Sequence, residues 1–154
     1  IGGSQVKILL VTSPGGHLAH LLALSSWWGK HERTWVTARQ DDTELALRGE
    51  DVSWCHWPTT RNLPNAIRNF GLAWKLVRAQ RPDVVVSDGA GVALPFFLVA
   101  RMLGIRTAYL ECYDRIEHPS LTARLCYPLS NVFCVQWDRQ LRRFPEAVNI
   151  GGVL

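Results

Sequence analysis

The sequence lacks any hydrophobic run long enough for a membrane-spanning helix. No stretch approaches the roughly 20 consecutive apolar residues that such a helix needs, and no signal-peptide pattern opens the chain. Four cysteines are present, but none forms a C-x-x-C pair, and most fall in apolar runs where a free thiol behaves as a small buried hydrophobe. We therefore expect reduced, structural thiols in a cytosolic protein, for which peripheral membrane contact stays open. The four are Cys55, Cys112, Cys126 and Cys134.

The sequence also lacks the familiar phosphate-binding and nucleic-acid-binding motifs. It contains neither G-x-G-x-x-G nor G-x-x-x-x-G-K-[ST], and it shows no signature of an RRM, a helix-turn-helix or a zinc module. His17 and His20 have a spacing that a metal tolerates, but no further cluster of cysteine, histidine or carboxylate completes a ligand set. We expect no metal, no cofactor and no nucleic-acid partner.

What remains is a composition suited to one globular domain over residues 1–154, although residues 1–4 carry no interpretable pattern. Of the 154 residues, 47% are hydrophobic and 19% are charged, which allows a sizeable core. Short β-branched runs alternate with longer helical patterns, and this alternation predicts a Rossmann-like, doubly wound parallel α/β sheet. Strands are predicted near Val6–Thr12, Thr34–Thr37, Val52–Trp57, Asp83–Ser87, Thr107–Glu111, Val132–Val135 and Val148–Ile150. Helices are predicted near Gly16–Trp28, Thr43–Leu47, Pro64–Ala79, Pro95–Leu103, Ser120–Leu129 and Asp138–Arg143.

The segment TSPGGHLAHLLAL, residues 12–24, joins the first predicted strand to a helix. Gly15 and Gly16 allow a sharp turn and a close approach of a ligand to the backbone, and the start of a helix offers unpaired N–H groups to a phosphate. A plain strand-to-helix turn explains the same glycines. His17 follows them, and its imidazole is suited to accept a proton from a hydroxyl held beside the phosphate.

A second glycine loop, SDGAGVALPFF, follows the fourth predicted strand. Its residues Asp88, Gly89, Ala90 and Gly91 lead into a helix in which Pro95 is suited to the first position. The carboxyl ends of parallel strands meet at one edge of the sheet, where ligands collect. We therefore expect the two glycine loops to face the same ligand, whereas a buried helix entered through a flexible turn is the simpler alternative.

Residues 52–82 contain no aspartate or glutamate but five basic residues and three tryptophans. Ile67, Phe70, Trp74 and Val77 recur at helical spacing and predict an amphipathic helix. This face either packs on the sheet or rests on anionic lipid headgroups. For the second possibility the candidate membrane-facing residues are Arg61, Arg68, Phe70, Trp74 and Lys75.

Three segments together resemble a known family. TSPGGHLAHLL, the long segment from SDGAGVALPFF through LECYDRIEHPSLTARLCYPLSNVFCVQW, and the ending NIGGVL are similar to the acceptor-side subunit of two-chain GT-B glycosyltransferases. That group includes the membrane-anchoring subunit of the dolichol-pathway UDP-N-acetylglucosamine transferase and bacterial capsule and exopolysaccharide homologues. The resemblance covers nearly the whole chain. It implies the fold of the N-terminal half of a GT-B enzyme.

The resemblance further implies a function shared between two chains. This chain would bind a polyprenyl-pyrophosphate-linked sugar at the inner face of the cell membrane, and a donor-binding partner would supply the UDP-sugar. Transfer would be inverting, metal-independent and β-1,4 in linkage, and would require both chains. A membrane-spanning anchor like that of the eukaryotic subunit is not present in this sequence, so a surface such as the 64–79 helix would make the membrane contact.

The family motifs also carry site residues onto this sequence. Catalytic candidates are His17 as the base and Glu111 as the second choice, while Arg115 either binds phosphate or forms a structural ion pair with Glu111 or Asp114. Residues implied in acceptor or phosphate binding are Gly15, Gly16, Asp88, Gly89, Ala90, Gly91, Arg115, Ser120 and Thr122. Two alternatives stay open: a non-catalytic membrane scaffold that recruits and activates the partner enzyme, and a stand-alone nucleotide-binding domain.

Overall fold

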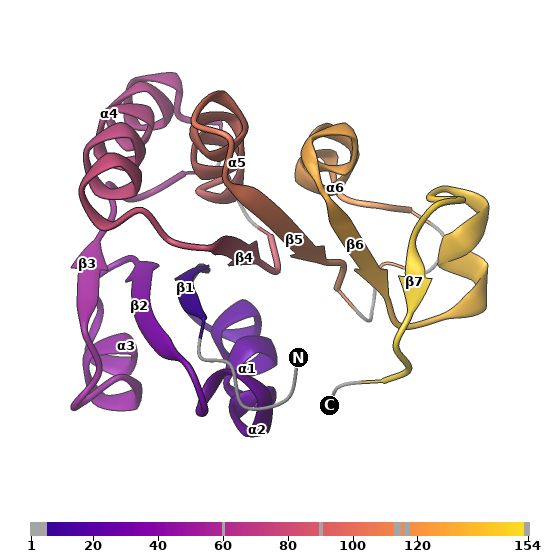
Figure 1. The fold of residues 1–154 in the computed structure, drawn as a ribbon, viewed down its shortest axis with the longest axis horizontal. Helices are drawn as coiled ribbons and strands as arrows, with labels where there is room; N and C mark the ends of the chain where they lie inside the picture. The colour runs from indigo at the N-terminus through magenta and orange to yellow at the C-terminus, as the bar shows by residue number, and fades with distance from the viewer. Residues whose placement is uncertain (1–5, 60, 90, 113–114, 116–117, 153–154) are drawn as a thin grey trace.

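A computed structural model describes residues 6–59, 61–89, 91–112, 115 and 118–152, and its described part contains one seven-stranded parallel sheet (Figure 1). The spatial order is β3-β2-β1-β4-β5-β6-β7. The chain therefore builds outward from β1 to one edge, returns beside β1 with β4, and builds to the other edge. The strands are β1 (Lys7–Val11), β2 (Glu32–Thr37), β3 (Val52–Trp54), β4 (Val84–Ser87), β5 (Arg106–Leu110), β6 (Val132–Val135) and β7 (Val148–Asn149).

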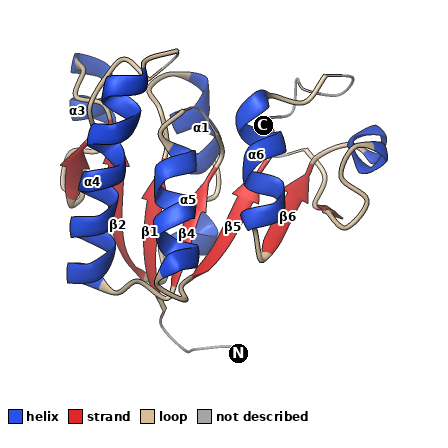
Figure 2. Ribbon diagram, turned by 90° about the horizontal axis from the view of Figure 1, so that it is seen from above, coloured by secondary structure: helices blue, strands red, loops and turns tan. Residues whose placement is uncertain are grey.

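Helices cover both faces of this sheet, as Figures 1 and 2 show. One face carries α4 (Leu63–Gln80), α5 (Ala93–Met102) and α6 (Leu121–Cys126), and the opposite face carries α1 (Gly16–Leu22), α2 (Ser25–Trp28) and α3 (Asp41–Ala46). Two short 3₁₀ helices, η1 (Tyr127–Leu129) and η2 (Asp138–Arg142), flank β6. The predicted Rossmann-like, doubly wound architecture is confirmed. No described helix has the combination of length and hydropathy that crossing a bilayer requires.

Alternating strand residues feed two separate cores. Leu9 and Val11 of β1 point to the α4–α5 side, whereas Ile8 and Leu10 point to the α1–α2 side, because successive side chains of a strand face opposite ways. The larger core ends in an aromatic cluster under α6. There Tyr109 stacks on Phe133 with ring centroids 4.9 Å apart.

Two differences from the predicted elements have local causes. The single helix predicted over 16–28 is broken after Leu22, because the indole N–H of Trp28 folds back and donates to the carbonyl of Leu21 at 2.6 Å. The third strand ends at Trp54, short of the predicted Trp57. The backbone N–H and C=O of His56 bond instead to the side chain of Asn69 on α4, at 2.8 and 3.1 Å.

The topology places a switch point between β1 and β4, where the crossovers turn to opposite sides of the sheet. Val11 of β1 is in register with Ser87 of β4, and Ser87 with Tyr109 of β5. Crevices at the carboxyl ends of such strands bind ligands in doubly wound sheets. The residues directly after these three strands are therefore the place for a site.

Replacing Phe133 by alanine tests the aromatic cluster. The Phe133 ring is 4% exposed and packs against three aromatic rings, so we expect the Phe133→Ala variant to lose about 3–5 kcal/mol of unfolding free energy. Its neighbour Val132 is 47% exposed, and Val132→Ala should cost no more than about 0.5 kcal/mol. Urea unfolding measures both. Equal losses would contradict this description of the core.

Candidate functional site

A groove of about 1070 Å³ opens at the carboxyl ends of β1, β4 and β5. Its walls come from the loops after these strands and from the starts of α4 and α6. The polar lining is Ser13, His17, Thr59, Arg61, Asn62, Cys112, Arg115, Ser120 and Thr122, and the other lining residues are Trp57, Leu63, Ala66, Gly91, Leu94, Leu121 and Leu125. The groove thus contains a titratable imidazole, two guanidinium groups and an apolar wall.

His17 stands at the first turn of α1, with a side chain 30% exposed to the groove. Its Nδ1 lies 3.1 Å from the backbone carbonyl of Asp88. A carbonyl can only accept, so this contact requires a proton on Nδ1. In the neutral imidazole, Nε2 is then the basic nitrogen. The β4 loop therefore sets the tautomer of a histidine that belongs to the β1 loop.

The carboxyl of Asp88 is fully buried beneath His17, although the sequence motif implied contact with phosphate. Its Oδ1 accepts from the Thr12 hydroxyl at 2.8 Å, and its Oδ2 lies 3.8 Å from His17 Nδ1 and 3.7 Å from His20 Nδ1. Burial raises the pKa of Asp88 well above its usual range, and the Thr12 hydrogen bond opposes that rise. Asp88 therefore acts on His17 from below, and does not line the groove.

Gly89 and Gly91 make room for protein groups. Gly89 has φ +126°, and a Cβ there would come 3.1 Å from His17 Cε1 and 3.0 Å from the Tyr109 hydroxyl. A Cβ on Gly91 would lie 3.1 Å from both Cβ and the carbonyl oxygen of Thr59. These glycines let the β4 loop approach His17 and the β3–α4 loop closely, which the sequence analysis had attributed to a ligand. Ala90 lies outside the described residues.

The first glycine pair forms the exposed entrance to α1. Gly15 is its N-cap with φ +83°, a conformation that favours glycine, and Gly16 is its first residue. Both stand between the groove residues Ser13 and His17. They remain predicted phosphate-binding residues.

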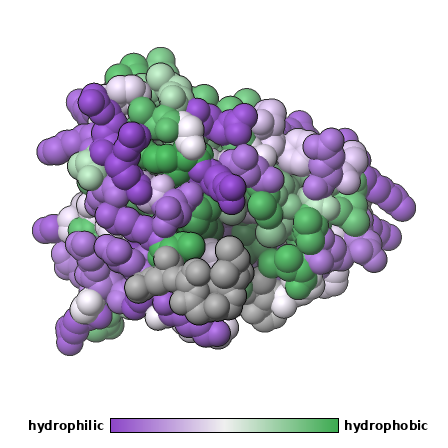
Figure 3. Space-filling view, viewed as in Figure 1, coloured by the Kyte–Doolittle hydropathy of each residue, from purple (hydrophilic) through white to green (hydrophobic). Residues whose placement is uncertain are grey.

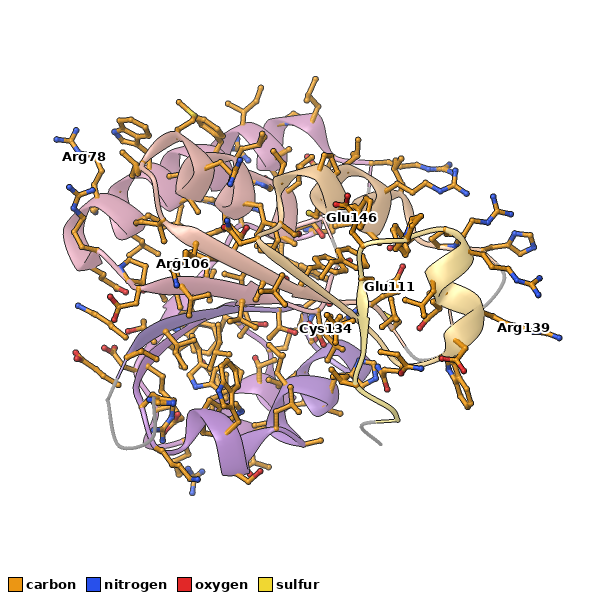
Figure 4. All side chains as sticks on the ribbon, turned by 45° about the vertical axis from the view of Figure 1, so that its right-hand side comes forward. Arg78, Arg106, Glu111, Cys134, Arg139 and Glu146 are labelled. Atoms are coloured by element: carbon orange, nitrogen blue, oxygen red, sulfur yellow. The ribbon has the colours of Figure 1, made fainter. Side chains whose placement is uncertain are left out.

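Glu111 is fully buried at the end of β5, so it does not reach the groove. One carboxylate oxygen accepts from the backbone N–H of Cys112 at 2.9 Å. Figure 4 places Glu111 inside the molecule beside the C-terminal segment. There Gln140, which the sequence did not single out, donates to the carbonyls of Cys112 and Arg115 at 3.0 and 3.1 Å. These contacts fit Glu111 to bracing the β5 loop, and leave His17 as the stronger candidate for the base.

The predicted residues after β5 have different surroundings. Arg115 is exposed and lines the groove. The Ser120 hydroxyl accepts from Ala123 N–H at 3.1 Å and caps α6, so its first role is structural. Thr122 is half-buried on the same wall. Asp114, the suggested ion-pair partner of Arg115, lies outside the described residues.

The exposed apolar side chains differ from those predicted to face a membrane. Phe70 and Trp74 of α4 are half-buried against the larger core, while Leu63 and Leu121 are 70% and 71% exposed on the groove wall. The buried stripe of α4 follows Asn65, Asn69, Ala73 and Val77, four residues apart, so the predicted face is rotated. Seen from the side of Figure 1, Figure 3 shows apolar residues gathered over the ends of α4 and α5, and mainly polar ones towards the β3 edge.

The basic residues predicted for that surface are exposed. Arg61 and Lys75 are exposed, and Arg61 lines the groove. Arg68 is exposed too, and its guanidinium donates to the side-chain oxygen of Asn65 at 2.9 Å. Among the described residues, no three histidines, cysteines or carboxylates are grouped as a metal site. The groove combines a base, cations and an apolar wall, which suits an amphiphilic anion bearing a hydroxyl.

Comparison with solved structures shows the fold. MurG from Acinetobacter baumannii superposes with a TM-score of 0.75 at 17% identity, over 96% of this chain and 44% of that one. UDP-N-acetylglucosamine 2-epimerase from Rickettsia bellii gives a TM-score of 0.78 at 13% identity, over 97% and 46%. The chain therefore spans less than half the length of these proteins. The predicted GT-B-type fold is confirmed.

Sequence relatives identify the family. The human protein named UDP-N-acetylglucosamine transferase subunit ALG14 is 28% identical over 97% of this chain and 84% of its own length, and that of Candida albicans is 26% identical over 96% and 77%. The pyrophosphoryl-undecaprenol N-acetylglucosamine transferase of Moorella thermoacetica is 31% identical over 58% of this chain and 24% of its own. A family model described as "Oligosaccharide biosynthesis protein Alg14 like" matches residues 55–153. The resemblance found in the motifs is thereby confirmed, and the chain belongs to the Alg14-like family of oligosaccharide biosynthesis proteins.

Proposed function

We propose that this chain is the acceptor-binding subunit of an inverting, metal-independent UDP-sugar glycosyltransferase that acts with a donor-binding partner chain. One observation carries the proposal: His17, held in the Nδ1–H tautomer, faces a groove with cations and an apolar wall. The family and its named transferase-subunit relatives support the reaction class. The acceptor would be a polyprenyl-pyrophosphate-linked saccharide in capsule or exopolysaccharide synthesis, extended through a β-1,4 linkage.

In this proposal His17 acts as the general base. Nδ1–H donates to the Asp88 carbonyl, so Nε2 takes the proton from the acceptor hydroxyl. The hydroxyl oxygen attacks the anomeric carbon of the sugar held by the partner, and UDP leaves with inversion. The imidazolium that forms lies 3.8 Å from the Asp88 carboxyl, which stabilises it by releasing its own proton to the surroundings.

The pyrophosphate and the lipid would occupy opposite kinds of wall. Arg61 and Arg115 are exposed in the groove and offer positive charge to a diphosphate. Leu63, Leu121 and Leu125 offer an apolar surface to the first isoprene units and to the membrane. Binding would therefore be peripheral, at the inner face of the cell membrane, with Arg68 and Lys75 attracting anionic headgroups.

The donor would come from another chain. The solved GT-B-type proteins that match are more than twice as long as the matched region, and the relatives' own names describe a transferase subunit. This supports a heterodimer or larger assembly in which the UDP-sugar is bound by the partner. The transferred sugar would then be chosen by the partner.

Substitution of His17 by glutamine tests the base. Glutamine keeps a donor for the Asp88 carbonyl but cannot accept the proton, so we expect kcat to fall about 10²–10⁴-fold in the complex. The measurement is sugar transfer from UDP-sugars to an undecaprenyl-pyrophosphate-linked sugar, using the chain co-purified with its partner. His56→Gln is the control, because His56 is exposed and outside the groove lining. Full turnover of His17→Gln with normal partner binding would instead support the scaffold alternative.

Asp88→Asn separates the buried role of Asp88 from acceptor binding. Asparagine fits the same space but cannot become negative beside the imidazolium, so kcat should fall about 10²-fold while KM for the acceptor stays unchanged. Asp51→Asn, on an exposed loop before β3, is the control. A raised KM at constant kcat would return Asp88 to the phosphate-binding role that the motif implied.

Exposed leucines of the groove wall test membrane contact. The double substitution Leu63→Ser and Leu121→Ser should weaken binding to vesicles of anionic phospholipid by about tenfold or more, because two apolar side chains lose their transfer free energy. Leu45→Ser is the control, since Leu45 is 65% exposed but lies on α3, across the sheet. Co-sedimentation measures both. Equal loss in both variants would place the membrane contact elsewhere.

A further inference from the structure

Cys112 brings a thiol next to the candidate base. Its Sγ lies 3.6 Å from His17 Nδ1 and 3.7 Å from the Asp88 carbonyl oxygen, and the residue lines the groove. The proton on Nδ1 therefore points into a region shared by a carbonyl oxygen and a sulfur. An imidazole N–H at this distance stabilises a thiolate, which is the nucleophilic form of cysteine.

The other three cysteines have surroundings that suppress reactivity. Burial raises the pKa of Cys55 to about 11 and that of Cys126 to about 12, and burial also raises the pKa of Cys134. Figure 4 shows Cys134 within the body of the molecule, on β6. None of the three lines the groove. The chain thus carries three thiols that serve as internal standards for the fourth.

We propose that Cys112 is a covalent modification site for small, soft carbon electrophiles that enter the groove. The thiolate sulfur attacks the electrophilic carbon, an S–C bond forms, and the leaving group departs with the bonding electron pair. The thiol proton passes to solvent, so no oxidant or reductant is involved. With iodoacetamide as the probe, the products are S-carbamidomethyl Cys112 and iodide.

The adduct has a consequence that rests on the proposed function. A carbamidomethyl group on Sγ fills space beside the His17 ring, where the acceptor hydroxyl would be deprotonated. Modification therefore inactivates transfer without separating the two chains. The surface of the groove gives the electrophile access, since both Cys112 and His17 are partly exposed.

The first experiment measures labelling alone, on the intact chain. Limiting iodoacetamide is added across a pH series, and peptide mass spectrometry follows all four cysteines. We expect Cys112 to react at least about tenfold faster than each of the others, with a midpoint below the value of about 8.5 for an unperturbed thiol. A Cys112 rate no greater than that of Cys55, or a midpoint at or above that of a free thiol, would overturn the proposal.

Variants then assign the effect to His17. In His17→Gln the Cys112 rate at neutral pH should fall about tenfold, whereas His56→Gln should leave it unchanged. Unaltered rates at Cys55, Cys126 and Cys134 verify that each variant is folded. An unchanged Cys112 rate in folded His17→Gln would refute the pairing. If that variant is unfolded, the pH series on the parent chain decides the question.

A second arm tests the consequence in the complex with the donor-binding partner. Transfer should decline in proportion to Cys112 labelling, while activity remaining in Cys112→Ser should not respond to the reagent. Full transfer at complete Cys112 labelling would refute the blocking effect. If the parent complex shows no transfer, the proposed function fails, but the labelling rates still support or refute the modification site.

Discussion

The site depends on one buried carboxyl that joins two loops. Because Val11 and Ser87 are in register on adjacent strands, the next residues, Thr12 and Asp88, leave the sheet side by side and bond at 2.8 Å. A buried carboxyl is costly unless polar neighbours compensate it. Here they come from Thr12 and from the histidines of α1, so the requirement to satisfy Asp88 fixes how the first helix sits over the fourth strand.

From this contact the chemistry of the groove follows outward. The carbonyl of Asp88 sets the tautomer of His17, and Gly89 permits the close approach because no Cβ stands between the loop and the ring. Farther out, the walls change from polar to apolar, towards Leu63 and Leu121. A base at one end and apolar side chains at the other match the order of groups in a lipid-linked sugar, with the diphosphate between them.

Local patterns in the sequence predicted what local patterns control. The strands, the glycine loops and His17 at the head of its helix were predicted from β-branched runs and turn residues. The depth of Asp88 and Glu111 was not, because burial depends on which strands become neighbours. The face of α4 was also predicted wrongly: aromatic residues dominated the helical pattern, but Asn65 and Asn69 are buried, where they bond to the carbonyl of Pro58 and the backbone of His56. A polar side chain with a buried partner leaves no signal in hydrophobic periodicity.

The division of labour in the proposed enzyme has a chemical reason. A neutral imidazole that can deprotonate a sugar hydroxyl can equally activate water, and water would hydrolyse a UDP-sugar held beside it. If the donor is bound by a separate chain, donor and base meet only after assembly, when the acceptor already occupies the groove next to His17. The open groove of the isolated chain is consistent with this order, since its base faces solvent and no glycosyl donor is yet in reach.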